Sequence, residues 1–114
     1  MTTTQMMAQD QIAANVQKWT LMLCDALAHD YERQYNRDGY EFYPETGRKY
    51  HKIIMNANGS RSVHAFVDKK TGEVYKSASW KSPAKGVRYD LRLIADREYL
   101  LEKADWSGGY LYAR

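Results

Sequence analysis

An α+β domain is the fold class that this sequence predicts, and three observations predict it. An apolar stripe with helical spacing runs from about residue 6 to residue 36. Alternating apolar and polar segments, separated by hairpin turn signals, follow over residues 48–79, and a helical pattern returns over residues 91–104. The expected order is therefore a long N-terminal helix, a three-stranded antiparallel β-meander and a C-terminal helix, or α-β-β-β-α.

The length of 114 residues predicts a single domain over residues 1–114, with residues 1–5 frayed. The one cysteine, Cys24, cannot form an internal disulfide, and we interpret it as a buried structural thiol in a reducing compartment. No run approaches the roughly 18–20 apolar residues of a membrane span, and the first ten residues are too polar for a signal peptide. We expect a soluble intracellular protein without a membrane partner.

The first helix is predicted from apolar residues at steps of three and four and from the absence of Gly and Pro in residues 1–38. Asn36, Asp38 and Gly39 then form a stop signal. Residues 40–47 contain Pro44 and Gly47, so we expect a packed connector there. The stripe consists of Ile12, Val16, Trp19, Leu23 and Leu27.

Three strands are expected over residues 48–56, 61–68 and 73–79. The first two are joined by an Asn58-Gly59 hairpin turn, and the last two by a turn that ends in Gly72. Residues 80–90 are expected to form a basic connector, after which Asp90 would cap the helix over 91–104. The aromatic tail, residues 105–114, is expected to dock on the domain through Trp106, Tyr110 and Tyr112.

The charge is concentrated in the middle of the chain. Residues 1–46 hold 3 Lys/Arg against 7 Asp/Glu, residues 47–92 hold 11 against 3, and residues 93–114 hold 3 against 4. The net charges are −4, +8 and −1, within a total of +3. Such a basic block indicates a polyanion or acidic partner, or else an acidic helix packed against a basic sheet, and both interpretations stay open.

The segment over residues 69–92 interleaves cations with aromatic side chains, a pattern typical of phosphate contacts combined with base stacking. The alternative is a solvated basic loop beside a hairpin, with Trp80 as a core anchor. The candidate residues for binding nucleic acid or a nucleotide-like anion are Lys69, Lys70, Lys76, Trp80, Lys81, Lys85, Arg88, Tyr89 and Arg92.

No catalytic or metal signature accompanies this segment. His51 and His64 could become neighbours in a hairpin, but two imidazoles without an Asp or Cys partner make a poor zinc site. Phosphate-binding loops, nucleophile elbows and dinucleotide fingerprints are absent from the sequence. We therefore expect neither an enzyme nor a cofactor or metal.

Residues 48–92 resemble a family of small uncharacterised proteins of tailed bacteriophages, notably those of actinobacteria. The segments TGEVYK, at 71–76, and ASWK-PAKGVR, at 78–88, carry the resemblance. It implies a phage-encoded protein acting in the host bacterial cytoplasm, in host takeover or counter-defence. The resemblance supplies no functional residues.

Three hypotheses follow from these features. The first is a non-enzymatic protein that binds nucleic acid or a nucleotide-like anion through its basic and aromatic face. The second is an inhibitor or adaptor of a host protein, acting through the first helix and exposed tyrosines, with a homodimer as one form. The third is a minor virion component.

Overall fold

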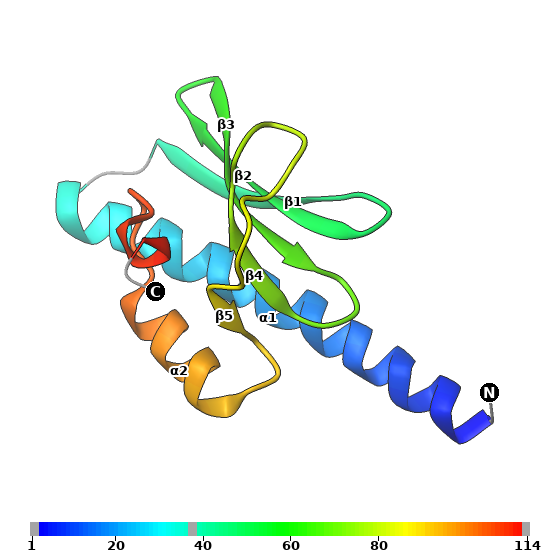
Figure 1. Ribbon diagram of the computed structural model, residues 1–114. Helices are drawn as coiled ribbons and strands as arrows, with labels where there is room; N and C mark the ends of the chain where they lie inside the picture. Colours follow the sequence, from blue (N-terminus) through cyan, green and yellow to red (C-terminus); the bar gives the residue numbers. More distant parts are fainter. Residues whose placement is uncertain (1–2, 37–38, 113–114) are drawn as a thin grey trace.

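The computed structural model describes residues 3–36 and 39–112, and it confirms the α+β class. Along the chain, a first α-helix is followed by a five-stranded antiparallel sheet, a second α-helix and a short 3-10 helix (Figure 1). The strands are hydrogen-bonded in sequence order, β1-β2-β3-β4-β5, so the sheet is a simple meander. The sequence predicted three of these strands.

Helix α1, Thr3–Tyr35, confirms the long N-terminal helix. Residues 3–5, expected to be frayed, are helical, and residues 1–2 lie outside the described residues. At 1.5 Å per residue its 33 residues span roughly 50 Å, which matches the 50 Å long axis of the molecule. The helix ends where Asn36 adopts a φ of 52° and donates its backbone N–H to Glu32 O, while Asp38 of the stop signal is not described.

The apolar stripe of α1 is buried against one face of the sheet. Val16, Leu23 and Leu27 are fully inaccessible to solvent and belong to the same core cluster as Ile53 and Val67 of the sheet. The N-terminal part of α1 extends beyond the sheet (Figure 1). The core therefore lies between the C-terminal two thirds of α1 and the sheet face that it covers.

The segment expected as a connector is strand β1, Tyr40–Thr46, which pairs with β2, Tyr50–Ala57. The connector prediction was wrong because Pro44 resembles a turn residue. Proline is tolerated in an edge strand, where one side of the backbone needs no ladder partner, and β1 pairs on one side only. Phe42 of this strand joins the core.

Strands β2 and β3, Ser60–Asp68, form the longest hairpin, and its turn is Asn58-Gly59 as predicted. Both turn residues have positive φ, at 55° and 91°, which is the geometry that Asn-Gly turns favour. Ile53 pairs with Ala65 and Ile54 pairs with Val63, so His64 lies between the two pairs as the additional residue of a bulge in β3.

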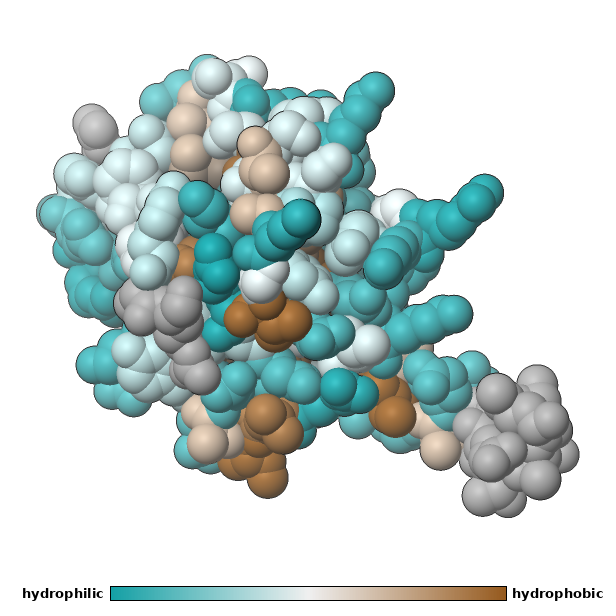
Figure 2. All heavy atoms as spheres, in the orientation of Figure 1, coloured by the Kyte–Doolittle hydropathy of each residue, from teal (hydrophilic) through white to brown (hydrophobic). Residues whose placement is uncertain are grey.

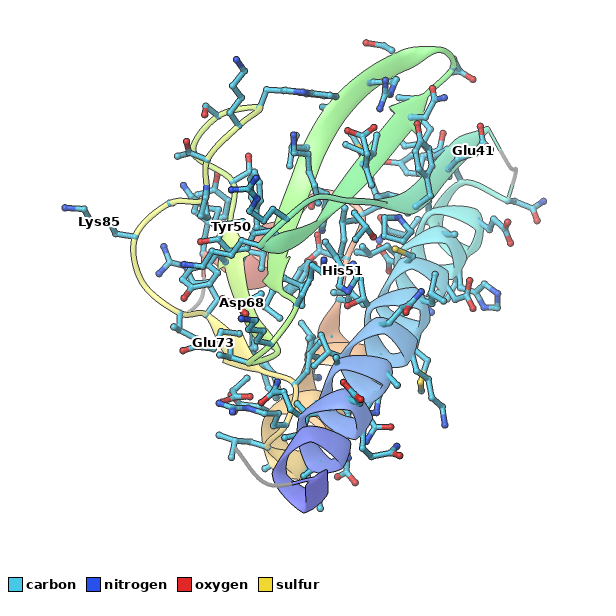
Figure 3. All side chains as sticks on the ribbon, turned by 90° about the vertical axis from the view of Figure 1, so that its right-hand side faces the viewer. Glu41, Tyr50, His51, Asp68, Glu73 and Lys85 are labelled. Atoms are coloured by element: carbon cyan, nitrogen blue, oxygen red, sulfur yellow. The ribbon has the colours of Figure 1, made fainter. Side chains whose placement is uncertain are left out.

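The last two strands are short. β4, Glu73–Lys76, ends three residues before the predicted limit, and β5, Tyr89–Asp90, was not predicted. The connector between them, residues 77–88, is closed by a bridge between Ser77 and Pro83. It lies on the side of the sheet opposite α1 (Figures 1 and 3).

Helix α2, Ile94–Lys103, begins three residues later than predicted. Asp90 does not cap it: the N-cap residue is Leu93, which makes no side-chain capping bond, and Asp90 instead donates its backbone N–H to Asp96 Oδ2. Leu91, expected in the helix, continues from β5 and donates its N–H to Gly72 O. Pairing of β5 with β4 therefore delays the start of the helix.

The tail folds back through Trp106 and Tyr110. Tyr110 is buried within the short 3-10 helix, Gly109–Leu111. The Trp106 ring meets Tyr31 and Tyr40 edge-on, with centroids 5.5 and 5.4 Å apart. Tyr112, in contrast, is 70% exposed, and residues 113–114 lie outside the described residues.

Asp30 of α1 joins the tail to the helix. Its buried carboxylate accepts hydrogen bonds from the backbone N–H of Trp106 at 3.0 Å and from Arg33 at 2.7 Å. We expect Asp30→Ala to lower the free energy of unfolding by about 2–3 kcal/mol, because the substitution leaves a partly buried N–H unpaired and loses a charge-assisted bond. Urea unfolding measures this change. Asp25→Ala, at an exposed carboxylate of the same helix, is the control, and an equal loss in both variants would contradict the prediction.

Candidate anion-binding site

The structure separates several of the residues that the sequence grouped as one binding segment. Tyr89 is only 1% exposed, and its hydroxyl donates to Tyr110 O at 2.8 Å. It is a core residue, so its prediction as a base-stacking residue was wrong. Arg92 is paired with Asp90 at 3.1 Å, which neutralises its charge. Lys76 lies with its Nζ 4.2 Å from the centroid of Tyr112, beside the C-terminal tail.

Lys85 and Arg88, in the connector over residues 77–88, are also separated from the other predicted cations. The Lys85 side chain projects away from the rest of the protein (Figure 3). Arg88 folds onto its own loop, where its Nη1 lies 3.4 Å from Gly86 O and its Nε is buried without a hydrogen-bond partner. Neither residue lines the two surfaces described next, where Lys69, Lys70 and Lys81 lie.

Four of the predicted residues, Lys69, Lys70, Trp80 and Lys81, lie on or beside two neighbouring surface hollows at one end of the sheet. The sheet topology brings this end together. In a meander, the β1–β2 and β3–β4 turns point to the same end of the sheet (Figure 1). Lys69, in the second turn, donates its backbone N–H to Lys49 O at 3.0 Å and its Nζ to Gly47 O at 2.9 Å. We call the cations gathered there the basic end: Arg48, Lys49, Lys52, Lys69, Lys70 and Lys81.

One surface is a pocket of about 200 Å³ on the sheet face away from α1, here called the outer pocket. Tyr50 and Phe66 supply aromatic walls, with ring centroids 5.5 Å apart in an edge-on arrangement. Figure 3 shows Tyr50 on this face and His51, the next residue, directed toward α1. Four cations line the pocket, namely Arg48, Lys49, Lys52 and Lys81.

The other surface is a groove of about 500 Å³ between the N-terminal part of α1 and the two turns, here called the helix groove. Asp10 and Ala13 line its helix side, and Lys69 and Lys70 line its turn side. Arg48 and Lys49 line both the helix groove and the outer pocket. The basic end is therefore continuous from one sheet face, around the β1–β2 turn, to the helix.

Two of the acidic side chains near the basic end, Glu45 and Asp68, are already engaged, while Asp10 lines the helix groove. Glu45, the one acid lining the outer pocket, is paired with Arg61 at 2.7 Å. Asp68 accepts the backbone N–H groups of Lys70 and Thr71 at 2.8 and 3.1 Å. None of the ion pairs formed within residues 3–36 and 39–112 includes a cation of the basic end. The outer pocket thus keeps an excess of positive charge, which favours an anionic ligand.

Trp80 lies beside the outer pocket. Lys52 Nζ lies 4.9 Å from its ring centroid and Arg61 Cζ lies 5.3 Å from it, so two cations hold the indole. Ile54 and Phe66 are buried although they point to the face away from α1, which the connector carrying Trp80 crosses, and Tyr50 and Lys52 also contact Phe66 there. Trp80 itself remains 41% exposed. The aromatic side chains grouped around Tyr50 and Lys52 on this face are Tyr50, Phe66, Tyr75 and Trp80.

The buried histidines add no charge to the site at neutral pH. Burial, followed by the nearby charge of Lys69, lowers the pKa of His51, whose Nδ1 lies 2.9 Å from Thr46 Oγ1. Burial lowers the pKa of His64 to about 4, and its Nε2 lies 2.8 Å from the Tyr110 hydroxyl. Lysine and arginine therefore supply all the positive charge of the basic end.

Metal and thiol chemistry find no support among the residues that the structure describes. These residues contain no cluster of three His, Cys, Asp or Glu side chains that could hold a metal ion. Cys24 is buried, and burial raises the pKa of its thiol to about 12, so the nucleophilic thiolate does not form near neutral pH. Within the same residues, neither helix is long and apolar enough to cross a membrane.

Sequence reasoning missed Arg48, Lys49 and Lys52 as site residues. They belong to the basic block, but lie 17 to 21 residues before the start of the segment that interleaves cations and aromatics. A signal was present in the predicted hairpin: once residues 48–56 pair antiparallel with residues 61–68, Arg48 and Lys49 fall at the same end of the sheet as the turn carrying Lys69 and Lys70.

The fold and the site together define a small α+β protein whose sheet has one face covered by a helix and a second face that is basic and aromatic. The chain belongs to a family of unknown function, DUF7717, whose sequence pattern matches residues 2–113. Comparisons with curated proteins and with solved structures found no match.

The low pKa of His64 predicts an acid-dependent loss of stability. Unfolded histidine titrates near pH 6.5, so the unfolded chain takes up a proton that folded His64 accepts only near pH 4. The contribution of His64 to the free energy of unfolding is complete above about pH 6.5 and is lost as the pH falls toward 4. The loss amounts to about 2 kcal/mol at pH 5.

Urea unfolding at pH 7.5 and at pH 5 measures this loss. His64→Gln keeps a polar group beside Tyr110 but does not titrate, so we expect its stability to change less between the two pH values than that of the wild type. An equal change in both proteins would contradict the prediction.

Proposed function

We propose that this protein is a non-enzymatic binding protein that holds nucleic acid or a nucleotide-like anion at the basic end. The observation that carries the proposal is the outer pocket, where four cations surround an aromatic wall and the one lining carboxylate is paired with Arg61. Cations on aromatic surfaces suit ligands that combine phosphate with a planar base.

The electrostatics of the basic end support a ligand with several negative charges. Six cations lie around two turns without carboxylate partners among the described residues, so they repel one another in the free protein. A polyanion would relieve this repulsion and release its own counterions on binding. A single small anion could occupy the outer pocket but could not also reach the helix groove.

The biological setting is part of the proposal. The resemblance of residues 71–76 and 78–88 to small proteins of tailed bacteriophages supports a phage-encoded protein that acts in the cytoplasm of the infected bacterium. Binding of nucleic acid or nucleotides suits host takeover or counter-defence in that compartment.

A second candidate function is inhibition of a host protein or an adaptor role. It is favoured by the exposed apolar residues Leu93 and Ile94, which are 56% and 63% accessible at the start of α2. Hydrophobic side chains gather over the start of α2 at the lower edge of Figure 2. Leu93→Ser with Ile94→Ser would weaken a protein complex that survives nuclease treatment and leave anion binding intact.

The test of the proposed function is a charge-matched pair of variants. We expect Lys52→Gln with Lys81→Gln to weaken binding of a labelled 20-nucleotide oligonucleotide or of ATP at least tenfold at 50 mM salt, since both residues line the outer pocket. Fluorescence anisotropy over a salt series measures the affinity and its salt dependence.

The control replaces two exposed lysines outside the basic end, Lys18→Gln with Lys103→Gln, and removes the same net charge. It should bind within twofold of the wild type. Absence of salt-sensitive binding to any oligonucleotide, duplex or nucleotide would refute the proposed function, and equal weakening in the two variants would show that net charge alone attracts the ligand.

A further inference from the structure

The geometry of the outer face points to a more specific ligand, and this inference rests on the proposed function. We propose that the protein binds single-stranded nucleic acid, with a base stacked on Trp80 and the adjoining phosphates held by the cations of the basic end. Three features of the structure carry this proposal: a supported aromatic platform, cations directly beside it, and a first helix unsuited to a duplex groove.

Trp80 is a supported platform. Lys52 Nζ and Arg61 Cζ lie 4.9 and 5.3 Å from the centroid of its ring, and the connector that carries it is hydrogen-bonded to β4 at two points. Ala84 donates its backbone N–H to Lys76 O at 2.7 Å. Arg88 donates its backbone N–H to Val74 O at 2.8 Å. An indole that is fixed in place and 41% exposed loses little conformational freedom when a base stacks on it.

Charge adjoins the platform on the same face. Lys81 follows Trp80 directly and lines the outer pocket, while Lys52 contacts the indole and lines the same pocket. Consecutive nucleotides present base and phosphate in alternation, so a stacked base brings its phosphates toward these two lysines. Arg48 and Lys49 then continue the positive charge around the β1–β2 turn toward the helix groove.

Helix α1, the long element beside the basic end, lacks the charge needed to enter a duplex groove. The described part of α1 carries Lys18 and Arg33 as its only basic residues, and Arg33 is paired with Asp30. The helix groove meets α1 at Gln9, Asp10 and Ala13, none of which is cationic. The stacking surface lies on the opposite face, and the bases of a duplex are stacked on one another, so a single strand can offer its base planes more readily.

The test compares single strands with duplexes of the same sequence. We expect a labelled 12-nucleotide single strand to bind at least tenfold more tightly than its duplex or than a mononucleotide at the same salt concentration. Trp80→Ala should weaken single-strand binding roughly 5- to 100-fold with little change in the salt dependence. Lys52→Gln with Lys81→Gln should instead lower the slope of log affinity against log salt by about 1.4.

Two controls separate stacking from folding. Tyr112→Ala removes an aromatic ring of the tail that is more exposed than Trp80 and lies beside Lys76, and it should leave the affinity unchanged. Trp80→Phe keeps a smaller ring on the platform and should bind with intermediate affinity. In the wild type, the single strand should quench tryptophan fluorescence, and this quenching should be lost in Trp80→Phe even though Trp19 and Trp106 remain.

The outcomes distinguish the two proposals. Equal affinity for duplex, mononucleotide and single strand, or quenching that persists in Trp80→Phe, would overturn single-strand binding and leave the proposed anion site standing. Binding that is unaffected by salt, or absent for all three probes, would remove the proposed function and this inference with it.

Discussion

The packing of α1 on one face of the sheet is the interaction on which the rest of the structure depends. Val16, Leu23 and Leu27 lose all solvent contact there, and burial of a large aliphatic side chain stabilises a fold by about 1.5–3 kcal/mol. Because α1, α2 and the tail close this face, the other face is left to the connector over residues 77–88, which crosses it, and to side chains such as Tyr50 and Lys52, which contact Phe66. The connector therefore has a structural role, and Trp80 remains partly exposed while it performs that role.

The basic end is a consequence of the meander. Successive hairpin turns alternate between the two ends of such a sheet, so the β1–β2 and β3–β4 turns must meet. Cations that are far apart in the sequence, such as Arg48 and Lys70, come to line one groove in this way. Exposed charges interact weakly in water, so the fold tolerates the cluster without a ligand, and the cluster keeps its attraction for an anion.

The same topology explains which parts of the site could be predicted. Trp80 and Lys81 were recognised because cations and aromatics alternate within a short segment, and that local pattern survives in the outer face. Tyr89 has the same local pattern, yet it pairs with β4 and enters the core, because a two-residue strand leaves no readable periodicity. Lys52 was missed for the opposite reason, since it lies far along the chain from Trp80 and its Nζ reaches that ring only in the folded protein.

By itself, the sequence determined the α+β class, the long first helix and the β2–β3 hairpin, because these depend on periodicities and turn residues within a few positions of one another. It also located the excess positive charge in the middle of the chain. Only the tertiary structure decided that the sheet has five strands and that Tyr89 is buried. It also decided that six cations gather at one end of the sheet. Those outcomes depend on which segments pair and pack in the folded chain, such as β1 with β2 and β4 with β5, and the residues of one short segment do not show its partner.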